Sequence, residues 1–442
     1  MTDVRLMTLD PGHFHAALLH GEMHAAVDPR VDIFAPVGPD LVAHLHRLAA
    51  CNRRQARPTS WAWEVHAGPD FLERMLHDRP GNVVVLSGRN RDKIDQILAS
   101  VRAGLSVLAD KPWVLRSADI PKLEAALADA DARGVVAYDI MTERFEATHA
   151  LQRALVNDEP TFGRIQPGTL EEPAVYMESV HYLKKVVAGA PNIRPAWFFN
   201  TEDQGEGLND VGTHLVDLVQ WTLFPDQAIS TADVQLLDAQ RWPTRISESD
   251  FRSVTNAPGF PPELGGSIVG GQFEYYCNTL VAYSLRGVHA RLHIAWDWEP
   301  LDALGDTHFA YYRGTKSRIE VRQTRGDGFR PELYVVPNDS AAKGRVLSAV
   351  RAKVAALQGE YPGIAAVDRA GEIHLSIPDA LRVGHEAHFA QVAATFLECL
   401  SDRSRLPPWE RPNMVAKYHV ATRGTELSRQ HPPAVAPRLA PR

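Results

Sequence analysis

The chain has 442 residues, of which 45% are hydrophobic and 23% are charged, and its formal net charge is -7. These are ordinary globular values, and a prior of about 150 residues per domain predicts two or three domains. They exclude a collagen-like chain and a disulfide-stapled miniprotein, and the negative charge disfavours general binding of nucleic acids or anionic membranes. We therefore expect a small-molecule partner.

Three cysteines, Cys51, Cys277 and Cys399, lie far apart in the sequence. Their odd number and wide spacing argue against a disulfide framework and a paired-cysteine zinc site, and they fit a reducing compartment. No signal peptide is visible at the N-terminus, and no stretch reaches the roughly 18 to 20 apolar residues that cross a bilayer. A cytoplasmic location is expected.

Residues 1–145 alternate short apolar runs with segments of helical period, which is typical of βαβ units in a doubly wound parallel sheet. The apolar run Val83-Val84-Val85 carries the strongest strand signal, and Gly104 and Gly134 predict helix ends. Strands are predicted at 4–9, 31–35, 82–87, 105–109 and 135–138, and helices at 15–26, 40–50, 71–77, 91–103 and 117–133.

After residue 145 the pattern changes to that of an α+β domain, which we expect to extend to residue 430. Short glycine turns such as Arg286-Gly287 join several strands, which favours a large, mostly antiparallel open sheet. Helices are predicted at 146–155, 209–223, 381–400 and 412–429, and strands at 231–238, 271–285, 288–298, 307–313 and 317–323. The Pro-rich tail 431–442 is expected to be disordered.

The turn after the first strand, Asp10-Pro11-Gly12-His13-Phe14-His15, stands where a dinucleotide-binding fold places Gly-x-Gly-x-x-Gly. Only the middle glycine is present, so an ordinary strand–helix turn is an equal alternative. The two histidines could also bind a metal, but no third ligand is identifiable, and we expect none. The acidic residue that normally ends the second strand and holds the ribose is missing, since Asp40 comes late.

Polar residues also follow two later strands, in the run Ser87-Gly88-Arg89-Asn90-Arg91-Asp92-Lys93 and in Asp110-Lys111-Pro112. The carboxyl ends of neighbouring parallel strands are where open α/β sheets bind ligands, so Lys111 is predicted to lie at a crevice. A solvated loop charge is the alternative for this lysine.

A third polar group, Asp210, His214 and Asp217, is spaced by four and three residues on the predicted helix 209–223. This spacing puts two carboxylates beside one imidazole, where they can select its tautomer and tune it to accept a proton near neutral pH. The alternatives are a structural histidine on a capped helix and a metal site, although three ligands from one helix are unusual.

Together these motifs resemble the glucose-fructose oxidoreductase, inositol dehydrogenase and MocA (Gfo/Idh/MocA) family. Its members join a Rossmann domain with a Glu-Lys-Pro signature to an open-sheet domain whose first helix carries Asp-x-Gly-x-His-x-x-Asp. Here Asp110 replaces the glutamate, whereas the helix motif from Asp210 to Asp217 is complete. Residues 312–320 look like the family's Gly-Thr-x-Gly turn, with Ser317 in place of the second glycine. The chain beyond residue 323 resembles the subgroup with an extended oxidoreductase C-terminal domain.

The resemblance implies hydride transfer between a carbohydrate hydroxyl, for example C3 of a glucoside or a related sugar or cyclitol, and nicotinamide. It assigns Lys111 to positioning the nicotinamide and hydrogen bonding the reacting hydroxyl, His214 to acid–base work and Asp210 to its support. The chemistry agrees, because alcohol oxidation needs a base and a cation at one oxygen.

The resemblance also predicts the binding residues and the assembly. We expect NAD as the cofactor, with NADP as the alternative, and a homo-oligomer, a dimer or tetramer, because the family's large sheet commonly makes subunit contacts. The cofactor residues are Gly12, His13, Phe14, His15, Ser87, Asn90, Lys93, Asp110 and Lys111. The substrate residues are Lys111, Arg144, His181, Tyr182, Asp210 and His214, with Trp296 and Trp298 as aromatic candidates that could instead belong to the core or a subunit interface.

Two other functions use the same residues. One is a redox-assisted glycoside hydrolase or lyase, in which tightly bound NAD oxidises the ring transiently and is regenerated, so no NADH accumulates. The other is a non-catalytic dinucleotide or sugar sensor, which would have little reason to keep Lys111 together with Asp210 and His214. A metal-dependent sugar isomerase is disfavoured because the sequence lacks eight βα units.

Overall fold

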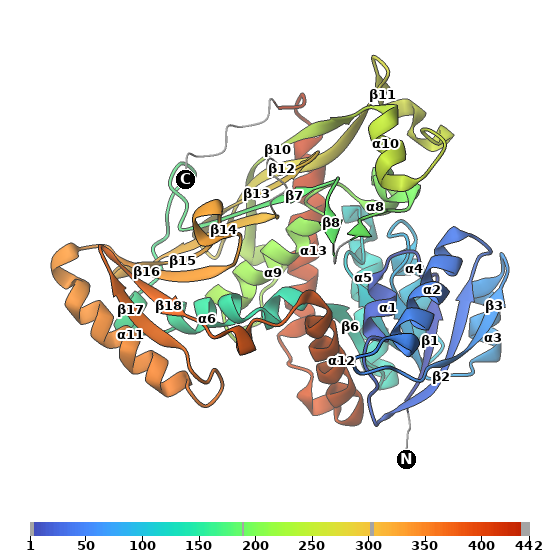
Figure 1. Cartoon of the computed structure of the whole chain (residues 1–442), viewed down its shortest axis with the longest axis horizontal. Helices are drawn as coiled ribbons and strands as arrows, with labels where there is room; N and C mark the ends of the chain where they lie inside the picture. Colours follow the sequence, from blue (N-terminus) through green and yellow to red (C-terminus); the bar gives the residue numbers. More distant parts are fainter. Residues whose placement is uncertain (1–3, 188–189, 301–304, 435–442) are drawn as a thin grey trace. The chain divides into compact units, whose positions relative to one another are not determined.

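The computed structural model describes residues 4–187, 190–300 and 305–434 (Figure 1). Most of the tail predicted to be disordered, from residue 435 on, lies outside these residues. The chain divides into two compact units. The first holds Met1–Thr142, Glu202–Gly205 and Gly384–Tyr418, and the second holds Glu143–Thr201, Glu206–Val383 and His419–Arg442. Among the described residues, no helix combines the length and apolar character that a membrane crossing requires.

The first unit is built on a six-stranded sheet with the order β3-β2-β1-β4-β5-β6, and every neighbouring pair is parallel. The order reverses between β1 and β4, as in dinucleotide-binding folds. The predicted doubly wound Rossmann sheet is therefore confirmed. The strands are β1 (Val4–Leu9), β2 (Val27–Ala35), β3 (Ala62–Ala67), β4 (Val83–Leu86), β5 (Ser106–Asp110) and β6 (Ala137–Ile140); the helices between them are α1 (His15–Leu19), α2 (Pro39–Arg53), α3 (Phe71–Asp78), α4 (Lys93–Arg102) and α5 (Ile120–Arg133).

Two elements of this unit differ most from the sequence prediction. Helix α1 ends at Leu19 instead of residue 26, because His20 and Gly21 bond three residues back in a tightened last turn and the chain then enters β2 at Val27. Strand β3 was not predicted. It is an edge strand with mostly exposed or half-buried side chains, so its sequence carries little apolar signal.

The chain returns to the first unit near its C-terminus, a segment to which the sequence pattern assigned no role. Helix α12 (His385–Ser401) packs against α1, and the ring of Phe389 lies 4.7 Å from the ring of His15. The first part of α13 (Glu410–Ser428) places Met414 and Tyr418 in the same apolar core as Trp113. The Rossmann core is thus completed by residues from the far end of the chain.

The second unit contains a ten-stranded sheet with the order β10-β12-β13-β7-β14-β15-β16-β18-β17, with β11 paired to β12. All neighbours are antiparallel except β13 and β7, so the predicted large, mostly antiparallel sheet is confirmed. The strands are β7 (Val175–Tyr182), β10 (Val234–Ile246), β11 (Ile268–Val269), β12 (Gln272–Leu285), β13 (Val288–Asp297), β14 (Thr307–Arg313), β15 (Ser317–Gln323), β16 (Glu332–Pro337), β17 (Ala365–Arg369) and β18 (Glu372–Ser376); β8 (Val186–Val187) and β9 (Ala190–Pro191) form a separate pair.

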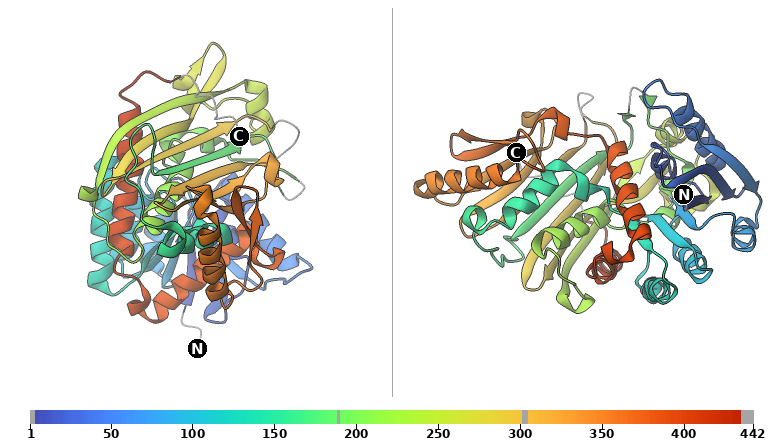
Figure 2. Two further views of the ribbon diagram at one scale, coloured as in Figure 1. Left: turned by 90° about the vertical axis from the view of Figure 1, so that its left-hand side faces the viewer. Right: turned by 90° about the horizontal axis from the view of Figure 1, so that it is seen from below.

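One face of this sheet is covered by helices α6 (Ala147–Val156) and α9 (Val211–Leu223) (Figure 2). The hydroxyl of Tyr312 on β14 donates to the carbonyl of Leu218, which ties α9 to the sheet. The remaining helices of this unit are α7 (Glu159–Phe162), α10 (Glu248–Thr255) and α11 (Lys343–Leu357), whereas most of the short helix α8 (Thr201–Gln204) belongs to the first unit. Helix α9 and strand β7 together position the polar side chains of this unit.

Candidate functional site

The loop that joins β1 to α1 lies close to the end of β4, although Asp10 replaces the first glycine of the dinucleotide fingerprint. Asp10 adopts a positive φ of 45°, and the amide of His13 donates to the carbonyl of Ser87 at 2.6 Å. A Cβ on Gly88 would come within 2.2 Å of the carbonyl oxygen of Asp10. The glycine that this approach requires therefore lies on the β4 side, at Gly88. Gly12 is buried in the loop, and Phe14, the residue before α1, is exposed.

His15 stands at the third fingerprint position and is buried against Asp110. Its Nδ1 lies 2.8 Å from Oδ2 of Asp110, the Nδ1 of His13 lies 3.5 Å from that oxygen, and the hydroxyl of Ser87 donates to it at 3.3 Å. Burial holds the pKa of His15 well below its ordinary value, so its neutral ring donates. Burial alone would raise the pKa of Asp110, but the hydrogen bond from His15 and the nearby ring of His13 hold it well below its usual range.

The sequence showed no third metal-ligand candidate beside His13 and His15. In the structure Asp110 takes that place, since the possible ligand atoms of the three side chains lie within 4.8 Å of one another. The 2.8 Å separation of His15 and Asp110 is a hydrogen-bond distance. It is shorter than the about 3.3 Å between two ligand atoms of a tetrahedral zinc ion with bonds near 2.0 Å. We therefore describe the group as a hydrogen-bonded cluster.

Asn90 and Lys93 form a buried network at the start of α4. The ammonium of Lys93 donates to Oδ1 of Asn90 at 2.5 Å and to the carbonyl of Asp110 at 2.9 Å, and burial lowers the pKa of Lys93 to about 8. The amide of Asn90 donates to the carbonyl of Gln204 at 2.8 Å. These bonds hold the loop after β4 against the end of β5.

Lys111 directly follows β5 and is 9% exposed, at the carboxyl edge of the sheet where the sequence analysis expected it. On the neighbouring strand β6, Asp139 pairs with the ammonium of Lys417 at 2.9 Å and accepts from the hydroxyl of Tyr418 at 2.8 Å. The Lys417 and Asp139 side chains are both buried. Helix α13 thus supplies a charge to this edge, which its ordinary helical sequence did not reveal.

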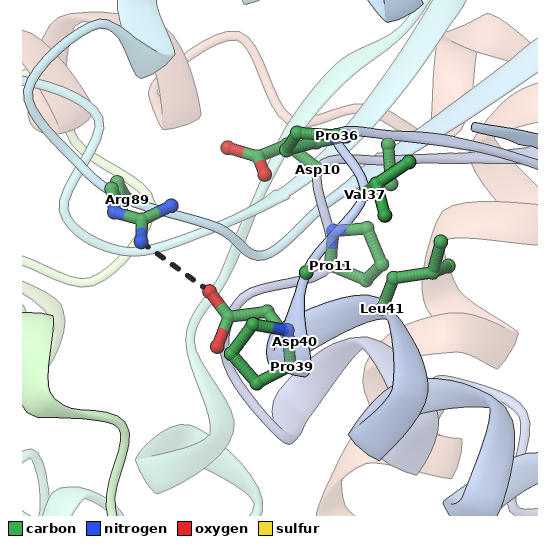
Figure 3. Close-up of a pocket in the computed structure, with 10 residues that line it drawn as sticks. Asp10, Pro11, Pro36, Val37, Pro39, Asp40, Leu41 and Arg89 are labelled. Atoms are coloured by element: carbon green, nitrogen blue, oxygen red, sulfur yellow. Dashed lines mark ion pairs between the residues drawn. The ribbon is translucent and has the colours of Figure 1, made fainter. Parts of the chain in front are cut away.

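A pocket of about 200 Å³ opens at the carboxyl ends of β1 and β2 (Figure 3). Asp40 lines it although it comes late in the sequence, and it faces Arg89 from the loop after β4, with 3.5 Å between Oδ2 and Nη2. Burial raises the pKa of Asp10, a second carboxyl at the pocket. The lining residues are Asp10, Pro11, Ala35, Pro36, Val37, Gly38, Pro39, Asp40, Leu41 and Arg89. Sequence analysis missed Arg89 here, because only the packing of parallel strands brings the two loops together.

In the second unit, Asp210 precedes α9 as its N-cap residue and His214 lies in the first turn, so the helix begins two residues later than predicted. Both oxygens of Asp217 accept from Arg144, with Nε to Oδ2 and Nη2 to Oδ1 each at 2.6 Å. This is a bidentate, largely buried ion pair. It joins the short helical turn Thr142–Phe145, just before α6, to the middle of α9.

His181 near the end of β7 is bonded through both ring nitrogens. Its Nδ1 lies 3.0 Å from Oδ2 of Asp306 and its Nε2 lies 2.8 Å from the hydroxyl oxygen of Ser179. The register explains this: Val180 is paired with Thr307, which puts Asp306 beside His181, and Ser179 lies two residues back on the same face. Lys185 donates to the same Asp306 oxygen at 2.6 Å.

Arg194 lies close to this group and was missed by the sequence analysis. Its guanidinium is 5.4 Å from the ring centre of Trp296, which is 4.8 Å from the ring centre of His181. Burial lowers the pKa of Arg194, and the charges of Asp210 and Asp306 oppose that effect. The residue before α9 and the carboxylate beside His181 therefore act on one guanidinium. Tyr182 is half-buried, and burial raises its pKa.

A parallel Rossmann sheet with the order 3-2-1-4-5-6, joined to a large open antiparallel sheet, defines the fold class of the Gfo/Idh/MocA oxidoreductases. Residues 151–429 match the family model described as "Putative oxidoreductase C terminal domain". The chain belongs to this family and is an oxidoreductase of the Gfo/Idh/MocA type.

Among solved structures, a "putative oxidoreductase" from Parabacteroides merdae ATCC 43184 shares 40% identity at a TM-score of 0.94, over 97% of this chain and 98% of that one. GenD2 from gentamicin A biosynthesis, solved in complex with NAD, shares 14% sequence identity at a TM-score of 0.58, over 97% of this chain and 95% of that one. KijD10, a 3-ketoreductase from Actinomadura kijaniata solved in complex with NADP and TDP-benzene, shares 16% sequence identity at a TM-score of 0.53, over 95% of this chain and 97% of that one. The last two show the fold alone. A comparison with curated proteins returned no match.

Proposed function

We propose that the protein transfers a hydride between a carbohydrate hydroxyl, for example C3 of a glucoside, and a nicotinamide dinucleotide. The observation that carries the proposal is the retention of two chemical parts within this family's fold: Lys111 at the carboxyl end of β5, and His214 one turn after Asp210 on α9. A sensor would need neither a lysine nor an acid–base histidine at these positions.

NAD is the cofactor that the pocket at β1 and β2 favours. Ribose hydroxyls donate to carboxylates, and Asp10 and Asp40 both line that pocket. A 2′-phosphate would meet those two carboxylates and one arginine, Arg89, which is already paired with Asp40. GenD2 carries NAD and KijD10 carries NADP, so the family fold accommodates both.

The proposed roles follow from the charge changes of alcohol oxidation. The bound nicotinamide supplies the hydride acceptor. Lys111 hydrogen-bonds the reacting hydroxyl and stabilises the negative charge on its oxygen as the proton leaves. His214 accepts that proton, with Asp210 supporting the imidazole, a form of catalysis that contributes about 10²- to 10⁴-fold.

The other predicted contacts are part of the same proposal. We place Gly12, His13, Phe14, His15 and Ser87 beside the dinucleotide, held by the network of Asn90, Lys93 and Asp110. We place Arg144, His181 and Tyr182 on the substrate side. We also propose a homo-oligomer, and a reducing cytoplasmic location supported by three free cysteines.

The test is to extract the purified protein for bound dinucleotide and then follow reduced-nicotinamide absorbance with glucosides and cyclitols plus NAD or NADP. Steady growth of reduced cofactor is the expected result. Bound NAD with product formation but no net reduction would instead identify the redox-assisted hydrolase or lyase. Absence of any bound or reducible cofactor would overturn the proposal. A sensor would keep its binding in the Lys111→Ala and His214→Ala variants without turnover.

A further inference from the structure

Strand β7 carries a proton-handling group that the roles of Lys111 and His214 do not use. Ser179, His181 and Asp306 form a continuous hydrogen-bonded chain, from hydroxyl to imidazole to carboxylate. We propose that His181, oriented by Asp306, is a second proton acceptor of the substrate-binding unit and removes the C–H proton next to the carbonyl that hydride transfer forms. This inference rests on the proposed function.

The proton acceptor in this chain is the imidazole and not the carboxylate. Burial alone would raise the pKa of Asp306, but the bonds from His181 and Lys185 lower it to about 2. Asp306 therefore stays ionised and accepts the Nδ1–H of His181, which directs the Nε2 lone pair towards the hydroxyl of Ser179. The hydroxyl of Ser179 donates to that lone pair at 2.8 Å and turns away when a substrate proton arrives.

Neighbouring histidines do not compete for this role. His308 on β14 is fully buried, and burial lowers its pKa to about 3, so it is neutral and unreachable at working pH. His149 faces it, with 5.4 Å between ring centres. The side chain of His181 is 21% exposed, so a ligand can contact it.

The surroundings of His181 suit the anion that this proton transfer creates. The Trp296 ring lies beside the imidazole, with 4.8 Å between the ring centres and 31° between the ring planes, and it is buried. The guanidinium of Arg194 lies 5.4 Å from the centre of the same ring and is buried, so its positive charge acts with little screening by water. An enolate formed beside Trp296 is therefore stabilised electrostatically.

Before this proton transfer, the carbinol carbon has lost its hydride to the bound dinucleotide and has become a carbonyl carbon. The adjacent C–H bond breaks, its electron pair moves towards the carbonyl to give an enolate, and the proton goes to Nε2 of His181. Reprotonation returns the ketone. Where the next carbon carries a leaving group, the same electron pair forms a C=C bond, the bond to the leaving oxygen breaks, and that oxygen takes a proton from water.

The experiment uses the full chain with NAD and methyl 3-keto-glucoside in heavy water, and follows the loss of the C2–H and C4–H signals by NMR. The wild-type protein is expected to catalyse exchange above the buffer rate. His181→Asn is expected to lose about 100-fold or more of that rate, as for other positioned bases. Oxidation of NADH by the same keto-sugar, measured at saturating sugar, should fall much less than exchange, because His181 contacts the substrate in both reactions but accepts a proton only in exchange.

Two further variants separate chemistry from folding. Ser179→Ala frees Nε2 and should keep or raise the exchange rate, whereas Asp306→Asn should lower it by misdirecting the tautomer and should lower hydride transfer less than exchange. The matched control is His77→Asn, an exposed histidine whose loss should change nothing. Unchanged exchange in a folded His181→Asn variant overturns the inference. Failure of hydride transfer in the wild type overturns the proposed function instead, because exchange on a ready-made ketone needs no redox step.

Discussion

The Nδ1 atom of His15 lies 2.8 Å from the Oδ2 atom of Asp110, and this contact joins the loop after β1 to the end of β5 across 95 residues of sequence. His15 stands at the third glycine position of the dinucleotide fingerprint, and Asp110 stands where the family signature has glutamate. A larger residue on one side of the contact therefore meets a shorter acid on the other. We infer that the two departures from the family pattern compensate for each other.

Substitutions at His15 and Asp110 test this compensation. Asp110→Asn removes the acceptor of a buried imidazole N–H, and Asp110→Glu crowds His15; each is expected to cost about 1–3 kcal/mol of unfolding free energy and to weaken NAD binding. The double variant His15→Gly with Asp110→Glu restores the family-like pair and should recover part of both losses. Denaturant unfolding and NAD titration measure the effects. The inference is contradicted if the effects of the single variants His15→Gly and Asp110→Glu simply add up in the double variant.

Cofactor preference should depend on Asp40 and Arg89 at the pocket in Figure 3. Asp40→Ala removes one carboxylate and releases Arg89 from its ion pair. The ratio of NADP to NAD turnover is expected to rise about tenfold, equivalent to about 1.4 kcal/mol. In Arg89→Ala the ratio should fall. An unchanged ratio in both variants would place the ribose elsewhere.

Lys111 should matter for chemistry more than for cofactor binding. Lys111→Met is expected to lower kcat about 10²- to 10⁴-fold, because the developing charge on the substrate oxygen loses its cation. NAD titration should give nearly the wild-type Kd. Lys122→Met is the matched control, since Lys122 on α5 pairs with Asp95 and Asp119 and is exposed. Equal losses in the two variants would indicate a general effect of removing a lysine.

His44 on α2 should make the protein sensitive to acid. Among the described residues neither ring nitrogen has a hydrogen-bond partner, and burial, with the charges of His20 and Arg47, lowers its pKa to about 3. The unfolded chain binds a proton at His44 below pH about 6.5, whereas the folded chain does not. The folded state therefore loses about 2 kcal/mol between pH 6.5 and pH 5 through this residue.

The variant His44→Leu removes this titration. Its unfolding free energy should fall less steeply below pH 6.5 than that of the wild type and should not be lower at pH 7, because a buried polar ring is replaced by an apolar side chain. Denaturant unfolding at several pH values measures both slopes. His77→Leu changes an exposed histidine and should keep the wild-type slope. Parallel curves for wild type and His44→Leu would show that this ring is protonated in the folded state.

The ion pair between Lys417 and Asp139 should anchor helix α13 to the Rossmann sheet. Both side chains are buried, so Lys417→Met leaves an uncompensated carboxylate and is expected to cost about 3–5 kcal/mol. Adding Asp139→Asn removes the buried charge while keeping an acceptor for Tyr418, and should recover much of that loss. A double-mutant cycle by denaturant unfolding measures the coupling. A coupling near zero would mean that water reaches the pair.

The periodicity of the sequence was sufficient for most of both sheets, because strands buried on both faces need continuous apolar runs and helices need an apolar stripe. Strands β14 and β15 have the predicted bounds. Strand β7 was missed because Glu178, Ser179 and His181 interrupt its apolar alternation. The polar side chains that make this strand chemically interesting also removed the signal by which a strand is recognised.

Motif spacing likewise singled out Lys111, Asp210 and His214 as candidates, since residues close in sequence keep their relation in any helix or strand end. Contacts between distant segments follow from packing instead. His181 and Asp306 are 125 residues apart, and Tyr418 reaches Asp139 over 279 residues. A local pattern holds no information about which of many acids will lie beside a given histidine. The sheet register and the docking of the C-terminal helices select those partners, because only the folded chain brings their backbones to within hydrogen-bond distance.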